Sequence, residues 1–353
     1  MRQREFEITE SGEPHAQRRR ELLARYPDIR ALFGFDRRTA LVTVGLVITQ
    51  LSLAGFIGWR VKAGEVFGSW WMVLIASYVV GAPLTHWLAM AIHETSHSLA
   101  LRTAWGNTAL ALFANAPMVL PFAISFNRYH LAHHQALNVL GEDTDIPLGV
   151  EVALIGNSTP RKLAAVFLHP LVYLVRGATF AKRPTREEIL NGLLILCCDL
   201  VIARYLGGAA LAYLSLAFLF ALGLHPVAAH FIHEHYTYAE GQETFSYYGP
   251  LNRICFNVGY HNEHHDFMNV PGRRLPELRQ LVPDYDALVS HTSWTGILWR
   301  FITDPEMGYG RRIVRSTEAY RRGRVETARQ RGLRRQVFPP SPPTFHSPGA
   351  VLS

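Results

Sequence analysis

Clusters of histidine are the feature of this sequence that could do chemistry. Residues 93–97 read HETSH, residues 130–134 read HLAHH and residues 261–265 read HNEHH. On a helix, positions i, i+3 and i+4 lie on one face, so each cluster would present two or three imidazole rings side by side. Two H-x-x-H-H segments in 353 residues are far beyond a chance match, so we interpret the clusters as metal-binding.

The number and type of these side chains limit the metal. Structural zinc is filled by four protein ligands, and catalytic zinc takes three and a water. Eight imidazoles are therefore enough for two metal ions with open positions. Neutral imidazole suits iron, zinc or copper, and a two-metal, all-nitrogen site beside lipid favours iron and oxygen chemistry. The residues alone leave the choice of metal open.

A competing interpretation starts from His93 and His97, because H-E-x-x-H on a helix is typical of zinc proteases, with the glutamate as the base. An intramembrane zinc protease would need a third ligand, and Asp199 is the one carboxylate deep in an apolar stretch. This interpretation leaves the six histidines of the other two clusters unexplained, so we disfavour it.

Apolar segments must position these clusters. Hydrophobic residues make up 49% of the chain and charged residues only 18%, a balance typical of membrane proteins. Residues 39–59 and 67–92 are each long enough to cross a bilayer, and the second stretch ends at His93. Residues 188–233 form a long apolar region that we divide into two antiparallel spans with a turn near Gly207.

Two further apolar segments are interrupted. Residues 108–126 contain Asn115, Pro117 and Pro121, which favours a re-entrant or interfacial segment. Residues 163–180 are more weakly apolar and are expected at the membrane interface. We therefore predict an all-α integral membrane protein, with four transmembrane helices in two hairpins and a cap that carries the histidine clusters.

The flanks of the spans predict orientation and boundaries. Nine arginines precede the first span, whereas the 60–66 loop has two basic residues, so both termini and the histidine clusters should be cytoplasmic. Residues 1–38 should form a cytoplasmic segment with a short amphipathic helix interrupted at Pro27 and packed on the body. Residues 39–312 form the membrane domain, and residues 313–353 a basic, Pro-rich, disordered tail.

The net charge of +7 suits an anionic membrane surface better than nucleic acid. The three cysteines give no disulfide framework.

The clusters and their flanks resemble a known family. The motifs RYHLAHH, GEDTDIP, ETFSYYGPLN and FNVGYHNEHHDF are similar to those of the sphingolipid delta-4 desaturases, in the membrane fatty acid desaturase and hydroxylase superfamily. The leader EPHAQRRRELLARYPDI also resembles that family, and the similarity runs from about residue 6 to residue 310. The chain departs from the usual pattern at Ser98, Met268 and His233, none of which removes a ligand.

The resemblance implies two iron ions and a set of ligands. The boxes supply eight of them: His93, His97, His130, His133, His134, His261, His264 and His265. One more histidine is expected from the end of the last span. We favour His230 there, with His225 or His235 as the alternatives, and expect His86 and His169 to lie outside the site.

The resemblance also implies a reaction. The chain should use O2 and two external electrons to introduce a trans C4–C5 double bond into the sphingoid chain of dihydroceramide. The alternatives on the same scaffold are sphingolipid C4-hydroxylation and desaturation of an acyl lipid. No H-P-G-G haem motif occurs in the sequence, so the electrons should come from a separate cytochrome b5 or ferredoxin. The location would be the endoplasmic reticulum in a eukaryote or the inner membrane in a bacterium.

Carboxylates stand beside the clusters at five positions, and some of them should accept a ring N–H and fix the tautomer of a ligand. The alternative is that they are solvated surface acids. These residues are Glu94, Asp143, Asp145, Glu263 and Asp266. The basic stretch 311–335 could dock an acidic electron donor, although attraction to the membrane surface is the preferred interpretation.

Overall fold

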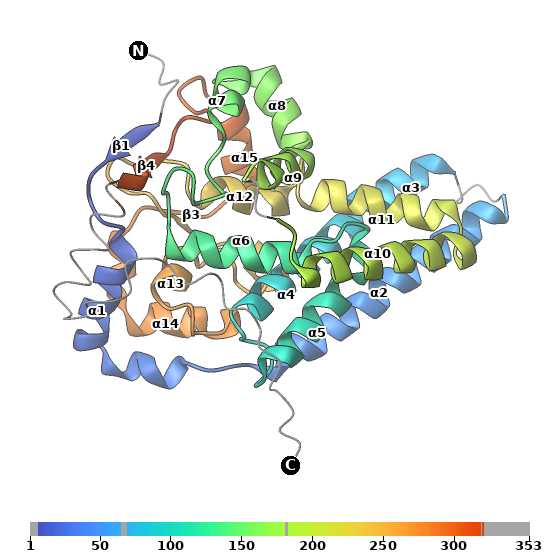
Figure 1. Ribbon diagram of the computed structural model, residues 1–353, viewed down its shortest axis with the longest axis horizontal. Coiled ribbons are helices and arrows are strands. Elements are labelled where there is room, and N and C mark those ends of the chain that lie inside the picture. Colours follow the sequence, from blue (N-terminus) through green and yellow to red (C-terminus); the bar gives the residue numbers. More distant parts are fainter. Residues whose placement is uncertain (1–5, 65–68, 181–182, 319, 321–353) are drawn as a thin grey trace.

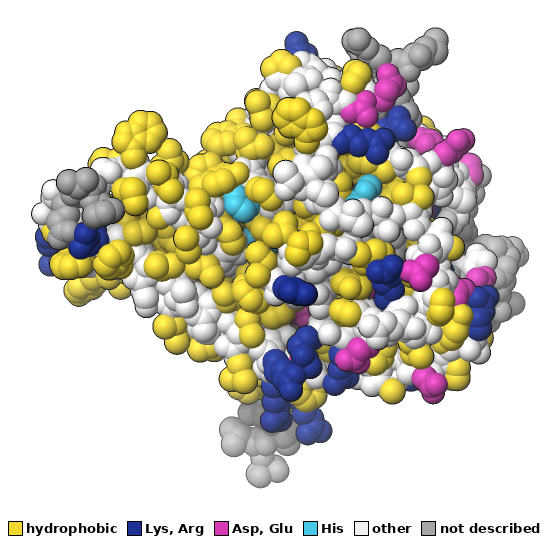
Figure 2. Space-filling model, turned by 180° about the vertical axis from the view of Figure 1, so that it is seen from behind, with side chains coloured by type: hydrophobic (Ala, Val, Ile, Leu, Met, Phe, Trp, Pro, Cys, Tyr) yellow, Lys and Arg dark blue, Asp and Glu magenta, His cyan; other side chains and the backbone are white. Residues whose placement is uncertain are grey.

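Two regions of different shape make up the described part of the chain. The computed structural model describes residues 6–64, 69–180, 183–318 and 320. Figure 1 shows an elongated bundle of long helices on the right and a rounder body of shorter helices on the left. Figure 2, seen from behind, shows hydrophobic side chains over most of the bundle, while most acidic side chains lie on the body. The bundle is the region that a membrane would surround.

Long apolar helices build the bundle. The helix α3 continues into α4 through a π-helical turn, η3 (Ser77–Gly81). Gly81 lets this turn pack against α11, because a Cβ atom there would lie 2.7 Å from the Cβ of Ala217. The bundle helices are α2 (Arg37–Lys62), α3 (Trp70–Ala76), α4 (Ala82–Ser96), α10 (Arg186–Tyr205) and α11 (Gly208–Ala221).

Three segments of this bundle have the length and composition of a membrane span, Arg37–Lys62, Trp70–Ser96 and Gly208–His233. The helix α10 is 20 residues long, but every 18-residue stretch of it holds at least three charged side chains. Gly207, with φ of 90°, makes the predicted turn between α10 and α11. The two predicted helical hairpins are present. Three of the four predicted spans have the length and apolar composition needed to cross a membrane. The start of the second predicted span, residues 67–68, lies outside the described residues.

The predicted re-entrant segment is a bent helix pair. The helix α5 (Ala104–Asn115) leads through a short turn, η4 (Ala116–Met118), into α6 (Ala123–Gln135), and the pair bends by 118°. Asn115 holds the bend, because its side-chain oxygen accepts from the backbone of Phe122 and Ala123 while its amide donates to Leu120. The bend redirects α6, with its H-x-x-H-H sequence, toward the body.

Short helices and turns form the body. Its helices are α7 (Gly149–Ile155), α8 (Thr159–Phe167), α9 (His169–Thr179), α12 (His230–His233), α13 (His261–Asp266), α14 (Leu275–Leu281) and α15 (Trp294–Thr303). Exposed apolar side chains cover one side of α8 and α9, including Leu168, Leu171 and Leu174. This face agrees with the amphipathic segment expected at residues 163–180. Buried side chains of α4, α11 and α15 form the core between the body and the bundle.

The described chain is mostly helical, as predicted, and two small parallel sheets are an addition that the all-α prediction lacked. The strand β1 (Glu7–Thr9) pairs with β4 (Ile313–Arg315), and β2 (Ser246–Tyr247) pairs with β3 (Ser290–His291). Strands of two or three residues are too short to produce a recognisable alternation in the sequence. The strand β4 also extends the ordered body past residue 312, where we had placed the start of the tail. Residues 321–353 of that tail lie outside the described residues.

The N-terminal segment forms the predicted helix packed on the body. It consists of α1 (Pro14–Arg25), capped by the Glu13 carboxylate, and a 3-10 turn, η1 (Pro27–Leu32), that begins at the predicted interruption. Figure 1 shows α1 beside α13 and α14. The N-terminal segment therefore lies against the helix that carries the third histidine cluster.

Candidate metal centre

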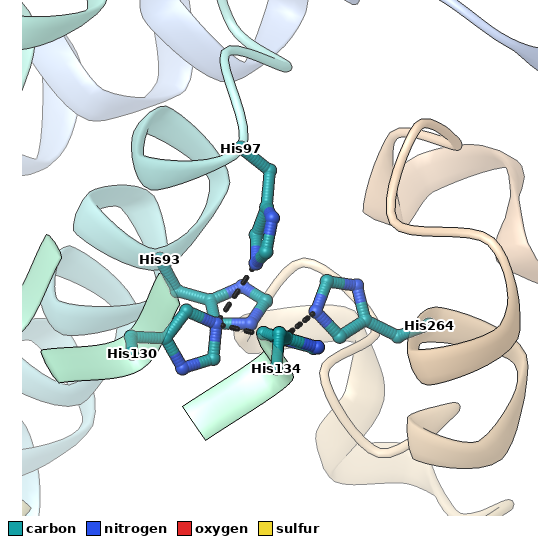
Figure 3. Close-up of side chains that lie close together, drawn as sticks. All are labelled: His93, His97, His130, His134 and His264. Carbon is teal, nitrogen blue, oxygen red and sulfur yellow. Dashed lines mark hydrogen bonds between the residues drawn. The ribbon is translucent and has the colours of Figure 1, made fainter. Parts of the chain in front are cut away.

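Five histidines from three distant segments converge in the first histidine group. Its members are His93 and His97 at the end of α4, His130 and His134 of α6, and His264 of α13, with one nitrogen of each within 4.8 Å of the others. Figure 3 shows the rings pointing toward one another. The Nε2 atom of His130 lies 2.8 Å from that of His97 and 3.1 Å from that of His134.

Three histidines form the second histidine group, which consists of His133, His235 and His265. The Nε2 atom of His261 lies 2.9 Å from that of His235, so His261 adjoins this group. Each H-x-x-H-H cluster is divided between the groups. In α6, His130 and His134 belong to the first group and His133 to the second. In α13, His264 belongs to the first group, while His265 belongs to the second.

The protonation state of these rings fits a metal. Burial lowers the pKa of His235, His261 and His265 well below the ordinary value, so the rings are neutral and each has one nitrogen lone pair. Lone pairs that face one another at close range need a proton or a cation between them. The Nε2 atom of His265 is buried without a hydrogen-bond partner. A pair of metal ions would satisfy both groups.

One predicted carboxylate orients a histidine of the second group. The Nδ1 atom of His133 lies 2.9 Å and 3.0 Å from the two carboxylate oxygens of Asp143, which can only accept. The ring therefore carries its proton on Nδ1 and keeps the Nε2 lone pair for a metal. Burial tends to raise the pKa of Asp143, but His133 and Arg312 lower it more, so the net pKa lies below the ordinary value. The carboxylate of Asp145 lies 3.6 Å from the same Nδ1 atom.

The other three predicted carboxylates hold the scaffold instead of a ligand histidine. Glu94 accepts from the backbone N–H of Gly272, and Glu263 accepts from the hydroxyls of Ser246 and Tyr248. Asp266 accepts from His15, Arg18 and Tyr285. A carboxylate that we did not predict, Glu234, lies 3.2 Å from Nδ1 of His261. It follows α12 directly and adjoins His235, and this adjacency is the signal that could have identified it.

The three histidines considered for the additional position lie in different surroundings. His230 lies outside both groups, and its Nδ1 atom is 2.8 Å from Nε2 of His86. His225 accepts a hydrogen bond from the backbone of Val227 through Nδ1. His235, one of the two alternatives, lies in the second histidine group together with His133 and His265. The helix α12 ends at His233, so the chain turns before His235, and helical spacing could not identify it.

Two family models match this chain. The family model described as "Fatty acid desaturase" matches residues 68–295, and the one described as "Sphingolipid Delta4-desaturase (DES)" matches residues 2–38.

Similar proteins cover most of the chain. The sphingolipid delta(4)-desaturase DES1 of Drosophila melanogaster is 45% identical over 88% of this chain and 95% of that protein. The DES1 protein of Xenopus tropicalis is 41% identical over the same shares. The human sphingolipid delta(4)-desaturase/C4-monooxygenase DES2 is 41% identical, also over 88% of this chain and 95% of that protein. The chain therefore belongs to the fatty acid desaturase family and, within it, to the sphingolipid delta(4)-desaturases.

Proposed function

We propose that this protein converts the C4–C5 single bond of dihydroceramide into a trans double bond. The observation that carries the proposal is the convergence of all three histidine clusters in two adjoining groups, in a chain whose relatives are named for this reaction. The overall reaction consumes one O2, two electrons and two protons. It takes two hydrogen atoms from the substrate and releases two waters.

Two iron ions fit the two groups. We propose that the first histidine group holds one ion, and that His133, His235 and His265 hold the other, with His261 beside them. Bound iron would react with O2, and this chemistry would remove hydrogen from an unactivated methylene. His235 thus takes the ninth position, for which the sequence had favoured His230.

The protein's own contribution is to position the ligands and the lipid. Asp143 fixes the tautomer of His133, and the neutral buried rings of His235, His261 and His265 present their lone pairs without a competing proton. The apolar bundle supplies a wall for the hydrocarbon chain. A one-electron donor, a cytochrome b5 or a ferredoxin, would bind on the cytoplasmic side, where we place both termini and the histidine groups.

A second outcome, C4-hydroxylation, is favoured by a specific observation. Rat, mouse and human relatives of 41–42% identity carry the name delta(4)-desaturase/C4-monooxygenase. Hydroxylation uses the same O2, electrons and protons but leaves one oxygen atom on the substrate and releases one water. Both outcomes begin by removing hydrogen at the same position, so one site can serve both.

The zinc protease interpretation loses its support. The carboxylate of Glu94 is held by the backbone of Gly272 and is not placed as a base between His93 and His97. Asp199, the expected third ligand, belongs to neither histidine group. Three further histidines surround His93 and His97 instead.

The test combines metal analysis with lipid analysis. The purified chain should contain about two irons, and cells that express it and are fed dihydroceramide should accumulate a product two mass units lighter. A product sixteen units heavier would identify the hydroxylase. A single zinc and an unchanged lipid would refute the proposal.

A further inference from the structure

A small cavity borders the second histidine group. It has a volume of about 40 Å3 and lies between α9, α12, α15 and the segment that follows α11. His235 forms part of its wall, and so does Asp145, whose carboxylate is 3.6 Å from Nδ1 of His133. The side chains of Val166, Leu222 and Phe301 form an apolar part of the lining. The cavity therefore connects the metal groups with an apolar wall.

Several polar atoms of the cavity lining can form further hydrogen bonds. The Nδ1 atom of His169 lies 2.9 Å from the carbonyl oxygen of Leu222, which can only accept, so the proton sits on Nδ1. Burial lowers the pKa of His169 to about 4, so the ring is neutral and Nε2 is an acceptor. Arg312 is 4% exposed, and its Nε–H is buried without a partner. The hydroxyl of Tyr173 donates to one carboxylate oxygen of Asp145. The other oxygen lies 3.6 Å from Nδ1 of His133, which is too far for a hydrogen bond, so it can accept from a ligand.

An unpartnered guanidinium N–H in a buried cavity is costly unless a ligand accepts from it. Three polar groups of the lining can therefore bind a ligand: Arg312 Nε as a donor, and His169 Nε2 and the Asp145 carboxylate as acceptors. The lining also includes Glu234, Tyr236 and Tyr309. A ligand with one carbonyl oxygen and two hydroxyl groups can pair with the first three.

The chemistry of the proposed substrate matches these atoms. In dihydroceramide, C4 is bonded to the carbon that bears the C3 hydroxyl, and the amide and the C1 hydroxyl follow within a span of about 4 Å. An enzyme that oxidises C4 must therefore recognise the polar head directly beside the metal. An acyl lipid that is oxidised in the middle of its chain would need an apolar wall at the same place.

We propose that this cavity binds the polar head of the sphingolipid, in extension of the proposed function. The C1 hydroxyl donates to His169 Nε2, the C3 hydroxyl donates to the carboxylate of Asp145, and the amide carbonyl accepts from Arg312 Nε. This arrangement fixes the distance from the head to the metal and so selects C4. His169, which the sequence placed outside the site, becomes a residue that determines specificity.

A single substitution can remove one of these contacts and keep the local structure. His169→Asn keeps a donor where Nδ1 stood, so the bond to Leu222 remains, but it removes the Nε2 acceptor. In membranes that contain the full-length protein, we expect the KM for dihydroceramide to rise about tenfold with little change in kcat. Wild type should prefer dihydroceramide about tenfold over an analogue that lacks the C1 hydroxyl, and the variant should lose that preference.

Two more variants complete the experiment. Leu174→Ala, on the exposed side of the same helix, should behave as wild type. Arg312→Lys keeps the charge but loses the Nε donor, and it should raise the KM for dihydroceramide as well. Iron content should be unchanged in all three variants, which separates loss of binding from loss of folding.

The outcomes distinguish this inference from the proposed function. If wild type contains iron and acts on dihydroceramide, but His169→Asn and Arg312→Lys keep its KM and its preference, the head-group site is wrong and the function stands. If wild type does not act on dihydroceramide at all, the proposed function fails and the inference fails with it.

Discussion

At the scale of single residues, the division of each H-x-x-H-H sequence explains how one short helix contributes to both histidine groups. In α6, His130 and His134 are one turn apart and belong to the first group. His133 precedes His134 by one residue, so it lies on a different side of the helix and belongs to the second group. The adjacent pairs, His133–His134 and His264–His265, hold the two groups next to each other. An H-x-x-H sequence without the last histidine would still reach both groups but would lack this adjacent pair.

His235 and His230 should behave differently when they are removed. His235→Ala should lower the iron content from about two to about one per chain and abolish desaturation, because it belongs to the second group. His230→Ala should keep both irons, since His230 contacts His86 and not the groups. Metal analysis of the two purified variants checks this. One iron in His230→Ala together with two in His235→Ala would restore our first choice.

Ser98 offers a prediction about stability. The residue has φ of 59°, a left-handed conformation that asparagine tolerates better than serine, and its side chain is exposed directly after His97. Ser98→Asn should therefore raise the free energy of unfolding by up to about 1 kcal/mol without a change in iron content. The thermal midpoint in detergent measures it, and Ser98→Ala is the control that should gain nothing.

At the scale of elements, α1 braces α13 from outside the metal centre. His15 is buried, its Nδ1 atom lies 2.7 Å from Asp266, and its ring centre lies 4.8 Å from that of His265. Arg18 contacts Asp266 at 2.6 Å and Asn262 at 3.0 Å. The leader thus holds the helix that carries three of the ligands.

Removal of the brace should weaken the second group first. Arg18→Ala leaves the buried carboxylate of Asp266 without its cation, which should cost about 3 kcal/mol of stability. We expect a lower thermal midpoint and less than two irons per chain, with the remaining iron in the first group. Arg20→Ala, exposed on the same helix, is the matched control. Equal iron contents in the two variants would show that α1 has no part in the metal centre.

The elements also show what the sequence could predict. The histidine spacing, the long apolar segments and the interruption at Asn115 follow from local rules, and they located eight of the nine histidines that converge or adjoin the groups. His235 was only one of three candidates and Glu234 was not predicted, because both lie in a turn after α12 whose direction depends on tertiary contacts. The strands β1 and β4 were not predicted for a similar reason. Each forms only by pairing with the other, which is far away in the sequence.

At the scale of the whole molecule, the apolar bundle and the polar body divide the surface. Figure 2 shows basic side chains at the far tip of the bundle and again where the bundle meets the body. Arg60 and Lys62 lie in the last turn of α2. A bilayer between these two levels would bury the helices and leave the histidine groups at its edge.

Thiol labelling tests this arrangement, including the status of α10 as a span. Cys197 and Cys198 lie near the middle of α10, so a membrane-impermeant maleimide should not modify them from either side of intact membranes. Ala63→Cys should be modified from the non-cytoplasmic side, and Ser11→Cys from the cytoplasmic side. Labelling of the native cysteines in intact vesicles would remove α10 from the set of spans.

The pairing of β1 with β4 has a consequence for the timing of assembly. Glu7 pairs with Ile313, so the first strand made must wait for a partner synthesised roughly three hundred residues later. At about 5–20 residues per second, the interval is about 15–60 s. The helices can enter the membrane during that time, but the body cannot close. The last histidine of the two groups is His265, so both groups are fully synthesised before β1 can pair with β4, and the closing of the body by this strand pair is a late step of assembly.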